Sequence, residues 1–504
     1  MSARGFRTDL LVVLASLLPL GLFLLRERGI AGSPGLPLDD SWIHLHFARN
    51  IAEGAGFSYN PGVPVAGSTA PLWTLLLALA VAAFGATLAT VKALGIAVAI
   101  GAALVTRRAA ISWGAPPAVA LAAGVALAWS GPVVWGALSG MEVPLAALLV
   151  ALALAAHARD WPGRTAALAA LATLARPEAL LLVPLLALAR PLTVRRAVVF
   201  AVVTVVVLAP AVAFNLATVG APVPATAAAK VEGGLLGWLS GVREPLALTL
   251  IGRPWAFFRE WVGWLVSTSW LLPFALLVAI PIAWVRTGRL LGFPAAALIA
   301  HPLAMALLAP YRGPGFQEGR YSIHLLPVAM VVVAAMARGR GKPRALGTPL
   351  ARRLPPPARI AVVAFLAAAV VGLIPAADRY AWGVQNINAM QVHLGRWVDA
   401  HVPRPARLAV NDVGAIAYFS RREVIDLMGL VTPEIIPYRR EGERGVIRYV
   451  IEKCPDYVIV FPAWFPELSA RADLLEPVYR VRLERNEVSG GPEMVVYRLT
   501  RCAV

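Results

Sequence analysis

The sequence predicts an α-helical polytopic membrane protein with a smaller α/β domain at its C-terminal end. The chain of 504 residues is 59% hydrophobic and only 15% charged, whereas soluble globular proteins carry roughly 25% charged residues. Its apolar residues gather in runs that can cross a bilayer as far as residue 376. After Asp378 the charge density becomes ordinary, and short β-like runs flank a helical stretch.

The first apolar run, residues 10–25, follows a basic N-terminus that contains Arg4 and Arg7. No small-residue cleavage site follows it, so we expect an uncleaved first helix that starts in the cytoplasm. About eleven spans are predicted in all, with 71–106 counted once although a hairpin around Lys92 would make it two. The other ten lie near 71–106, 116–130, 143–158, 164–176, 179–189, 197–217, 262–285, 291–309, 322–337 and 360–376.

The positive charges orient these spans. The net charge is +18, but the arginines cluster in short segments between apolar runs, which favours cytoplasmic loops and not nucleic-acid binding. Residues 338–359 hold seven basic residues and no acid, so this loop is expected in the cytoplasm. The chain is therefore predicted to be multi-pass in the plasma (inner) membrane, with everything after Asp378 on the exoplasmic face.

Two domains follow from this pattern: a membrane domain at 1–377 and an exoplasmic α/β domain at 378–504. Strands are predicted in R-L-A-V, D-Y-V-I-V-F, V-Y-R-V-R-L and M-V-V-Y-R-L, and a helix over 433–453. Both cysteines, Cys454 and Cys502, fall in the second domain. They can pair in an oxidising compartment or remain free thiols, and the sequence leaves this open.

Five polar segments fall at the predicted exoplasmic ends of helices. Ionisable groups beside apolar spans usually face a cavity, which makes each a candidate site. The segments contain Asp39 and Asp40; Glu142 in S-G-M-E; Arg176 and Glu178 in A-R-P-E; Lys230 in P-A-T-A-A-A-K; and Arg320 and Tyr321 in Q-E-G-R-Y.

Each segment also has a purely structural interpretation. Asp39 is a favourable helix N-cap, Arg176 and Glu178 can form a local ion pair, and Lys230 and Arg320 can extend toward lipid headgroups. His44 and His46 are spaced i, i+2, which does not place both rings on one helical face, so no metal site is predicted there. Residues 42–53 are instead expected to lie on the membrane with Trp42, Ile43 and Phe47 toward lipid.

Together the five segments combine groups suited to phosphosugar chemistry. A carboxylate can act as a general base, while Lys and Arg can hold a phosphate and stabilise it as a leaving group. This combination at a membrane surface fits group transfer from a lipid-linked phosphosugar.

The first loop, D-D-S-W-I-H-L-H-F-A-R-N-I-A-E-G-A-G-F-S-Y-N-P-G-V-P-V-A-G-S-T-A-P-L-W, resembles that of GT-C membrane glycosyltransferases, particularly the mycobacterial-type terminal arabinofuranosyltransferases. The resemblance continues in order through S-G-M-E, A-R-P-E-A, P-V-P-A-T-A-A-A-K, E-G-R-Y before H-L-L-P, and N-D-V-G-A-I-A-Y-F-S. It spans nearly the whole chain. The departure is P-A-T-A-A-A-K, which lacks the aromatic and amide residues often found before the Lys in this family.

The resemblance implies an inverting transferase that uses a polyprenyl-phosphate sugar donor and a glycan or lipid acceptor, with no cofactor, although a divalent metal is not excluded. Asp39 or Asp40 would activate the acceptor hydroxyl, the two remaining interchangeable at this point. Lys230, Arg320 and Tyr321 would bind the donor phosphate. The sugar or the base would be oriented by Glu142, Arg176 and Glu178.

Three alternatives remain open. A transporter or lipid-handling protein would place its charges near the bilayer midplane and often show an inverted repeat, and neither is visible. A transferase of the same class can act on protein hydroxyls or lipid A. A non-catalytic relative can bind glycan through its C-terminal domain, although the presence of both Asp39 and Asp40 argues against it.

Overall fold

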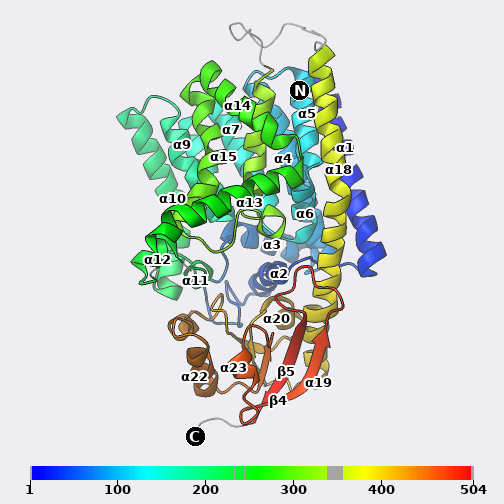
Figure 1. The fold of residues 1–504 in the computed structure, drawn as a ribbon, viewed down its shortest axis with the longest axis vertical. Coiled ribbons are helices and arrows are strands. Elements are labelled where there is room, and N and C mark those ends of the chain that lie inside the picture. Colours follow the sequence, from blue (N-terminus) through cyan, green and yellow to red (C-terminus); the bar gives the residue numbers. More distant parts are fainter. Residues whose placement is uncertain (1–2, 232, 243, 338–355, 501–504) are drawn as a thin grey trace.

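A computed structural model describes residues 3–231, 233–242, 244–337 and 356–500 of the chain. The molecule is elongated, with a helical bundle at one end and an α/β domain at the other (Figure 1). The prediction of a largely helical membrane protein with a C-terminal α/β domain is confirmed. The helices before residue 337 are α1 Ala3–Ala31, α2 Asp39–Ala52, α3 Pro71–Phe84, α4 Leu88–Ser112, α5 Pro117–Ala128, α6 Gly131–Ser139, α7 Val143–Ala158, α8 Pro162–Ala175, η1 Pro177–Leu181, α9 Leu182–Leu188, α10 Val194–Val219, α11 Ala225–Ala229, α12 Gly234–Leu239, η2 Leu248–Gly252, α13 Arg253–Thr268, α14 Leu272–Thr287, α15 Arg289–Leu308, α16 Phe316–Gly319, η3 Ile323–Leu325 and α17 Leu326–Ala335.

Five helices among the described residues are long and apolar enough to cross a membrane: α1, α4, α10, α15 and the continuous helix Arg359–His401. The number rises to seven if two bent pairs each form one span; α5 and α6 meet at 53°, and the stretch ending at Thr268 meets α14 at 111°. The predicted count of about eleven therefore stays a prediction. The basic loop that oriented the spans lies almost entirely outside the described residues. Its location in the cytoplasm therefore stays a prediction.

The apolar run 71–106 is not one helix, which corrects the prediction. The break lies between Phe84 and Leu88 and not at Lys92. Gly85 has a φ of 84°, and the Thr87 side chain accepts a 3.1 Å hydrogen bond from the Thr90 amide, so it caps the next helix. A glycine with left-handed geometry followed by a threonine cap ends one helix and starts another.

Lys92 lies inside α4, where it forms a buried ion pair. Its ammonium donates to both carboxylate oxygens of Glu27 at 2.5 and 2.8 Å, and the Tyr380 hydroxyl donates to the same carboxylate at 3.2 Å. Because removal of one partner leaves an uncompensated buried charge, such pairs are costly to break. The pair links α1 and α4 to α18 (Pro356–Ile387).

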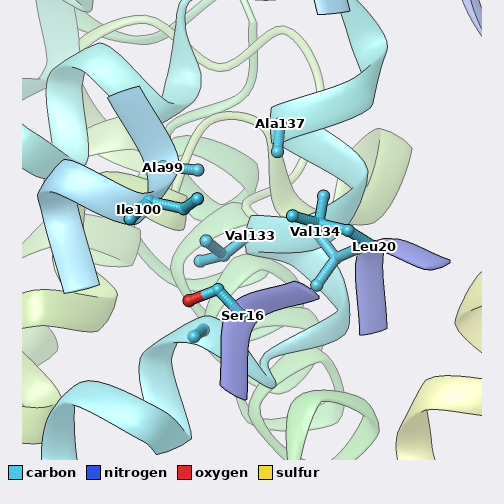
Figure 2. A pocket seen from close by; sticks show the side chains of 8 residues that line it. Ser16, Leu20, Ala99, Ile100, Val133, Val134 and Ala137 are labelled. Carbon is cyan, nitrogen blue, oxygen red and sulfur yellow. The ribbon is translucent and has the colours of Figure 1, made fainter. Parts of the chain in front are cut away.

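Small residues let the bundle helices approach closely. A Cβ on Gly95 of α4 would collide with the Ala137 carbonyl of α6, as expected where backbones pack against each other. Figure 2 shows a small cavity between α1, α4 and α6 that is lined almost entirely by aliphatic side chains. Its one hydroxyl, on Ser16, already donates to the Val12 carbonyl at 2.7 Å. This cavity therefore offers no free polar group to a ligand.

The C-terminal domain contains a five-stranded sheet with the order β2-β1-β3-β5-β4. Strand β1 pairs with β2 and with β3 in parallel. Strand β5 pairs with β3 and with β4 in the antiparallel direction. Four predicted strands are confirmed, whereas β2, with the sequence E-V-I-D, was not predicted. The elements are η4 Asn388–Val392, α19 His393–His401, β1 Arg407–Val410, α20 Gly414–Ser420, β2 Glu423–Asp426, η5 Pro433–Ile435, α21 Ile436–Arg439, α22 Glu443–Lys453, β3 Tyr457–Val460, α23 Pro466–Ser469, β4 Leu475–Arg482 and β5 Glu493–Leu499.

Helices cover both faces of this sheet. Alternate residues of β1 point to opposite sides: Leu408 and Val410 pack with α19 and α20, and Ala409 packs with α22. The predicted helix over 433–453 is divided into η5, α21 and α22. Cys502 lies outside the described residues, so the question of its pairing with Cys454 stays as the sequence left it.

The predicted domain boundary between 377 and 378 falls within a continuous helix. Helix α18 runs from the bundle along the side of the molecule and continues through η4 into α19 of the α/β domain (Figure 1). The division into 1–377 and 378–504 remains a prediction, because no break in the backbone marks it.

Helix α2 lies between the bundle and the α/β domain (Figure 1). This corrects the expectation that residues 42–53 lie on the membrane: Trp42, Ile43 and Phe47 are all buried. The Trp42 ring packs 4.8 Å from Phe419 of α20, and Ile43 and Phe47 join the core of the α/β domain. Apolar side chains that we expected to face lipid instead pack against a protein domain.

Helix α2 holds α20 at both ends. The Asp39 carboxylate accepts hydrogen bonds from the amides of Gly414 and Ala415 at 2.6 and 2.7 Å, and Arg49 donates to the Tyr418 carbonyl at 2.8 Å. A carboxylate at a helix N-terminus and a cation near its C-terminus both interact favourably with the helix dipole. The first loop and the α/β domain are thereby fixed to each other.

This contact leaves no room for a side chain at Gly414, where a Cβ would collide with the backbone and carboxylate of Asp39. We expect Gly414→Ala to destabilise the attachment by about 1–3 kcal/mol, the usual cost of overpacking. Gly163→Ala is the matched control, because a Cβ there meets nothing within 4 Å. Amide hydrogen exchange in α20 would measure the effect, and equal exchange in the two variants would contradict the contact.

Candidate active site

Asp39 and Asp40 form the first turn of α2 but have different surroundings. Both oxygens of Asp39 are bound to α20, as described above. One oxygen of Asp40 accepts a 2.7 Å hydrogen bond from Arg320, and 34% of the Asp40 side chain stays exposed. Asp40 is therefore the carboxylate that a second molecule can reach.

The pKa values of the two carboxyls move in opposite directions. Burial raises the pKa of Asp39 to about 7, against the opposing effect of the two backbone amides. Burial also acts to raise the pKa of Asp40, but the positive charges of Arg320 and Lys230 outweigh it and hold that pKa below its usual value. Asp40 is thus ionised at neutral pH, whereas Asp39 titrates near it.

Arg320 and Tyr321 follow a turn with an unusual backbone. Gln317, Glu318 and Gly319 have φ values of 48°, 61° and 76°, all left-handed. Each non-glycine residue in this region costs about 1–2 kcal/mol. Such strain persists only where the surroundings impose it, and it is often found at functional sites.

The surroundings of this turn impose its conformation. The Trp264 ring nitrogen donates to the Glu318 carbonyl at 3.0 Å, and Arg379 binds the Glu318 carboxylate at 2.5 and 2.9 Å. A Cβ on Gly319 would collide with the Trp264 ring. Helices α13 and α18 therefore fix the turn that directs Arg320 toward Asp40.

Arg320 and Tyr321 are both buried. Arg320 donates to the Tyr321 hydroxyl at 3.4 Å, and the guanidinium carbon of Arg176 lies 4.6 Å from the centre of the Tyr321 ring. Burial raises the pKa of Tyr321, but Arg320, Lys230 and Arg176 reverse the shift, so the net direction is downward. A tyrosine surrounded by three cations is a good hydrogen-bond donor to an anion.

Arg176 and Glu142 form the centre of the buried charge network. Arg176 donates to Glu142, which is fully buried, and binds Glu178 at 3.0 and 3.2 Å. The other Glu142 oxygen lies 3.3 Å from His44 Nε2, and His44 Nδ1 lies 3.1 Å from the Thr74 hydroxyl. Burial favours a protonated Glu142, but the charge of Arg176 dominates and lowers its pKa well below the usual range.

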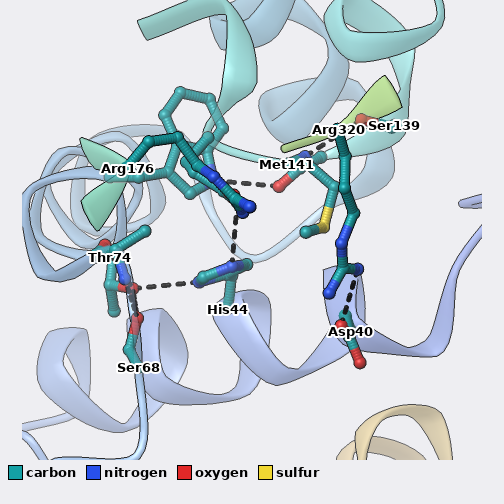
Figure 3. Close-up of polar contacts among 12 residues, drawn as sticks. Asp40, His44, Ser68, Thr74, Ser139, Met141, Arg176 and Arg320 are labelled. Carbon is teal, nitrogen blue, oxygen red and sulfur yellow. Dashed lines mark hydrogen bonds and ion pairs between the residues drawn. The ribbon is translucent and has the colours of Figure 1, made fainter. Parts of the chain in front are cut away.

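Figure 3 shows this arrangement, with His44 and Asp40 projecting from α2 toward Arg176 and Arg320. His44 was not predicted as a site residue, because its i, i+2 spacing from His46 was tested only as a metal motif. The sequence did contain a pattern that points to His44: it follows Asp40 by four residues, which places both side chains on the same face of a helix. Among the described residues no group of three His, Cys, Asp or Glu side chains could hold a metal ion.

Lys230 ends the short helix α11 and lies nearer the surface than the rest of the cluster. Its ammonium lies 5.7 Å from the centre of the Tyr311 ring. In the described part of the chain it has no ion-pair partner, yet its charge acts on both Asp40 and Tyr321. The structure therefore brings Lys230 into the same electrostatic cluster as the other predicted residues.

All eight predicted residues belong to one connected region, although they come from five separate segments. Asp40, Arg320, Tyr321, Arg176 and Glu142 are linked by hydrogen bonds or ring contacts. Asp39, at the start of α2, is turned toward the α/β domain. Two further carboxyls act on it from that domain, namely the half-buried Asp412, which accepts from Gln391 at 2.8 Å, and the buried Asp426.

The comparisons with known proteins concern fold and one domain. A model for a domain of unknown function, DUF8728, matches residues 385–497. No sequence of a curated protein matches the chain. ArnT from Cupriavidus metallidurans bound to undecaprenyl phosphate is similar in structure, with a TM-score of 0.57, 14% identity and coverage of 98% of each chain.

Another similar structure is the Archaeoglobus fulgidus oligosaccharyltransferase tethered to an acceptor peptide. It has a TM-score of 0.56 and 14% identity over 98% of this chain and 74% of that one. The mycobacterial arabinofuranosyltransferase AftD reaches a TM-score of 0.44 with 40% of its chain covered, which is too weak to carry an argument about the sugar. The chain thus has the fold of the GT-C membrane glycosyltransferases.

The raised pKa of Asp39 predicts a pH-dependent attachment of the α/β domain. The folded state binds the Asp39 proton between about pH 4 and 7 while the unfolded state has released it, so stability falls as pH rises through this window. Asp39→Asn cannot titrate, and we expect it to flatten this fall. Thermal unfolding of both proteins between pH 4.5 and 8.5 would measure it, and parallel profiles would contradict the assignment to Asp39.

Proposed function

We propose that the protein is an inverting glycosyltransferase that takes a sugar from a polyprenyl-phosphate donor and transfers it to a cell-envelope glycan or lipid. The observation that carries the proposal is the position of Asp40. A partly exposed carboxylate lies 2.7 Å from a buried arginine whose neighbour is a cation-surrounded tyrosine. A base and a phosphate site thus adjoin each other within a GT-C-like fold.

Asp40 is the proposed general base. It takes the proton of the acceptor hydroxyl while that oxygen attacks the anomeric carbon of the donor sugar. The bond between the anomeric carbon and the phosphate oxygen breaks, and the electron pair leaves with the lipid phosphate. Arg320 on the other Asp40 oxygen fixes the carboxylate orientation but also weakens it as a base, so positioning contributes more here than basicity.

Lys230, Arg320 and Tyr321 form the proposed phosphate clamp. Negative charge grows on the phosphate as the bond breaks, and preorganised donors stabilise it most where they are already desolvated. Arg320 and Tyr321 are buried. Lys230 lacks an ion-pair partner among the described residues and can approach the phosphate when the donor binds.

Glu142, Arg176 and Glu178 support this cluster. The Glu142 and Glu178 carboxylates hold Arg176, whose guanidinium packs on the Tyr321 ring. His44 links the same network to α2. We assign these groups to the orientation of the clamp and the sugar.

The proposed site lies at the end of the bundle beside the α/β domain, which corresponds to the exoplasmic face in the topology derived above. A transporter would need charges within the bilayer, so the location favours a transferase. The sugar, with arabinofuranose as one candidate, and the acceptor, including protein or lipid A, belong to a donor and acceptor screen. No metal is used in the proposed step.

Removal of the base should abolish most transfer. We expect Asp40→Asn to lower kcat by about 100-fold to 10,000-fold, the usual contribution of a general base, without loss of folded protein. Glu484→Gln, at an exposed carboxylate of the α/β domain far from the proposed site in sequence, is the matched control. Transfer from radiolabelled polyprenyl-phosphate sugars by purified protein would test both, and full activity of Asp40→Asn would remove it from the mechanism.

The clamp can be tested by conservative replacement. Arg320→Lys keeps the charge but loses the fork that binds Asp40 and Tyr321, and we expect a loss of about 10-fold to 100-fold in kcat/KM. Lys230→Gln should weaken donor use by a similar factor. Arg471→Lys, at an exposed arginine of the α/β domain, is the control. If the Lys230 and Arg320 variants turned over the donor normally, both residues would be simple headgroup contacts.

A further inference from the structure

A second cavity, of about 400 Å³ and lined mainly by polar residues, lies at the end of α2 away from Asp40. It is formed by the last two turns of α2, the loop after it and the turn between α20 and β2. Small-molecule sites have volumes of about 300–1,000 Å³, so the cavity suits a small ligand or part of a larger one. Its lining residues are His46, Arg49, Asn50, Glu53, Asn60, Pro61, Val63, Arg421, Arg422 and Glu423.

The walls of this cavity are held by internal hydrogen bonds. Asn50 donates to the carbonyls of Ser58 and Tyr59 at 2.9 and 2.8 Å, and Asn60 both donates to and accepts from the Val424 backbone. Arg422 donates to four backbone carbonyls and to the Asp399 carboxylate. These residues have their partners already, and they give the cavity a preformed shape.

Three charged side chains of the lining are different. Arg421, Glu53 and Glu423 have no side-chain hydrogen bond or ion pair among the described residues, and all three are exposed. Arg421 is also left-handed, with a φ of 52° at the end of α20. Glycine usually occupies this position at the end of a helix, so the arginine adopts the left-handed conformation at a small conformational cost.

These free groups restrict the chemistry of a ligand. A phosphate would be repelled by Glu53 and Glu423, and a metal cation by Arg421 and Arg49. A ligand with several hydroxyl groups satisfies both kinds of residue, because it can donate to the carboxylates and accept from the guanidinium. Charged groups also form stronger hydrogen bonds to such a ligand than neutral ones.

The position of the cavity relates it to the proposed reaction. Asp40 and Glu53 lie on the same helix, and a rise of 1.5 Å per residue separates them by roughly 20 Å. A chain of a few sugar residues spans such a distance. We propose that this cavity binds a hydroxyl-rich part of the acceptor glycan, several sugars from the hydroxyl that reacts; its link to an acceptor rests on the proposed function.

The test measures binding without turnover. The purified full-length protein in lipid nanodiscs is titrated with linear mannotriose, maltotriose and arabinotriose, and hydrogen exchange is followed in residues 46–63 and 418–424. We expect at least one trisaccharide to protect both segments. Arg421→Gln should weaken that binding about tenfold, the usual effect of losing a charged hydrogen bond.

Two further variants keep the result decisive. The double variant Glu53→Gln, Glu423→Gln replaces two charged acceptors by neutral amide oxygens and should weaken binding to a similar degree. Arg444→Gln is the matched control, an exposed arginine on α22 at the opposite face of the sheet. It should bind as the unmodified protein does.

Several results would overturn the proposal. They are the absence of protection by all three trisaccharides, equal binding by the Arg421 and Arg444 variants, and protection by inorganic phosphate alone. Failure of the proposed function is separate, because it is read from donor turnover and Asp40→Asn. Trisaccharide binding without any transfer would keep the glycan site and discard the transferase.

Discussion

The attachment of α20 to α2 is the interaction on which the rest of the site depends. One membrane-side helix supplies a carboxylate to the N-terminus of α20 and a guanidinium to a carbonyl of its last turn. Aromatic packing of Trp42 on Tyr418 and Phe419 fills the space between them. Because Asp39 is held in this way, the adjacent Asp40 has a fixed direction toward Arg320.

The two neighbouring aspartates show how one motif serves two purposes. Burial against α20 raises the pKa of Asp39, whereas the positive charges around Asp40 lower the pKa of that carboxyl. The buried network of Glu142, Arg176 and Glu178 would be expensive if any member were missing. Its arginine lies over the Tyr321 ring, so the network also fixes the position of that tyrosine.

The sequence predicted the fold class and the convergence of the polar segments because both follow from patterns along the chain. Apolar runs and basic loops are local properties, and the five segments share one end of the bundle through simple alternation of spans. The surroundings of α2 could not be predicted in this way, because Trp42 and Phe47 have the same pattern whether they meet lipid or protein. Nor could the separate roles of Asp39 and Asp40, which depend on Gly414 some 375 positions later in the chain.

The continuous helix that joins bundle and α/β domain sets more than a distance. Its 43 residues extend roughly 65 Å, about twice the hydrocarbon thickness of a bilayer, so the helix is long enough to cross a bilayer and to continue into the α/β domain. Each residue of an α-helix also advances the backbone by about 100° around the helix axis. The length of this helix thus sets the orientation of the α/β domain about the helix axis. A single inserted residue would shift the domain by only about 1.5 Å along the axis but would rotate it by about 100° away from α2.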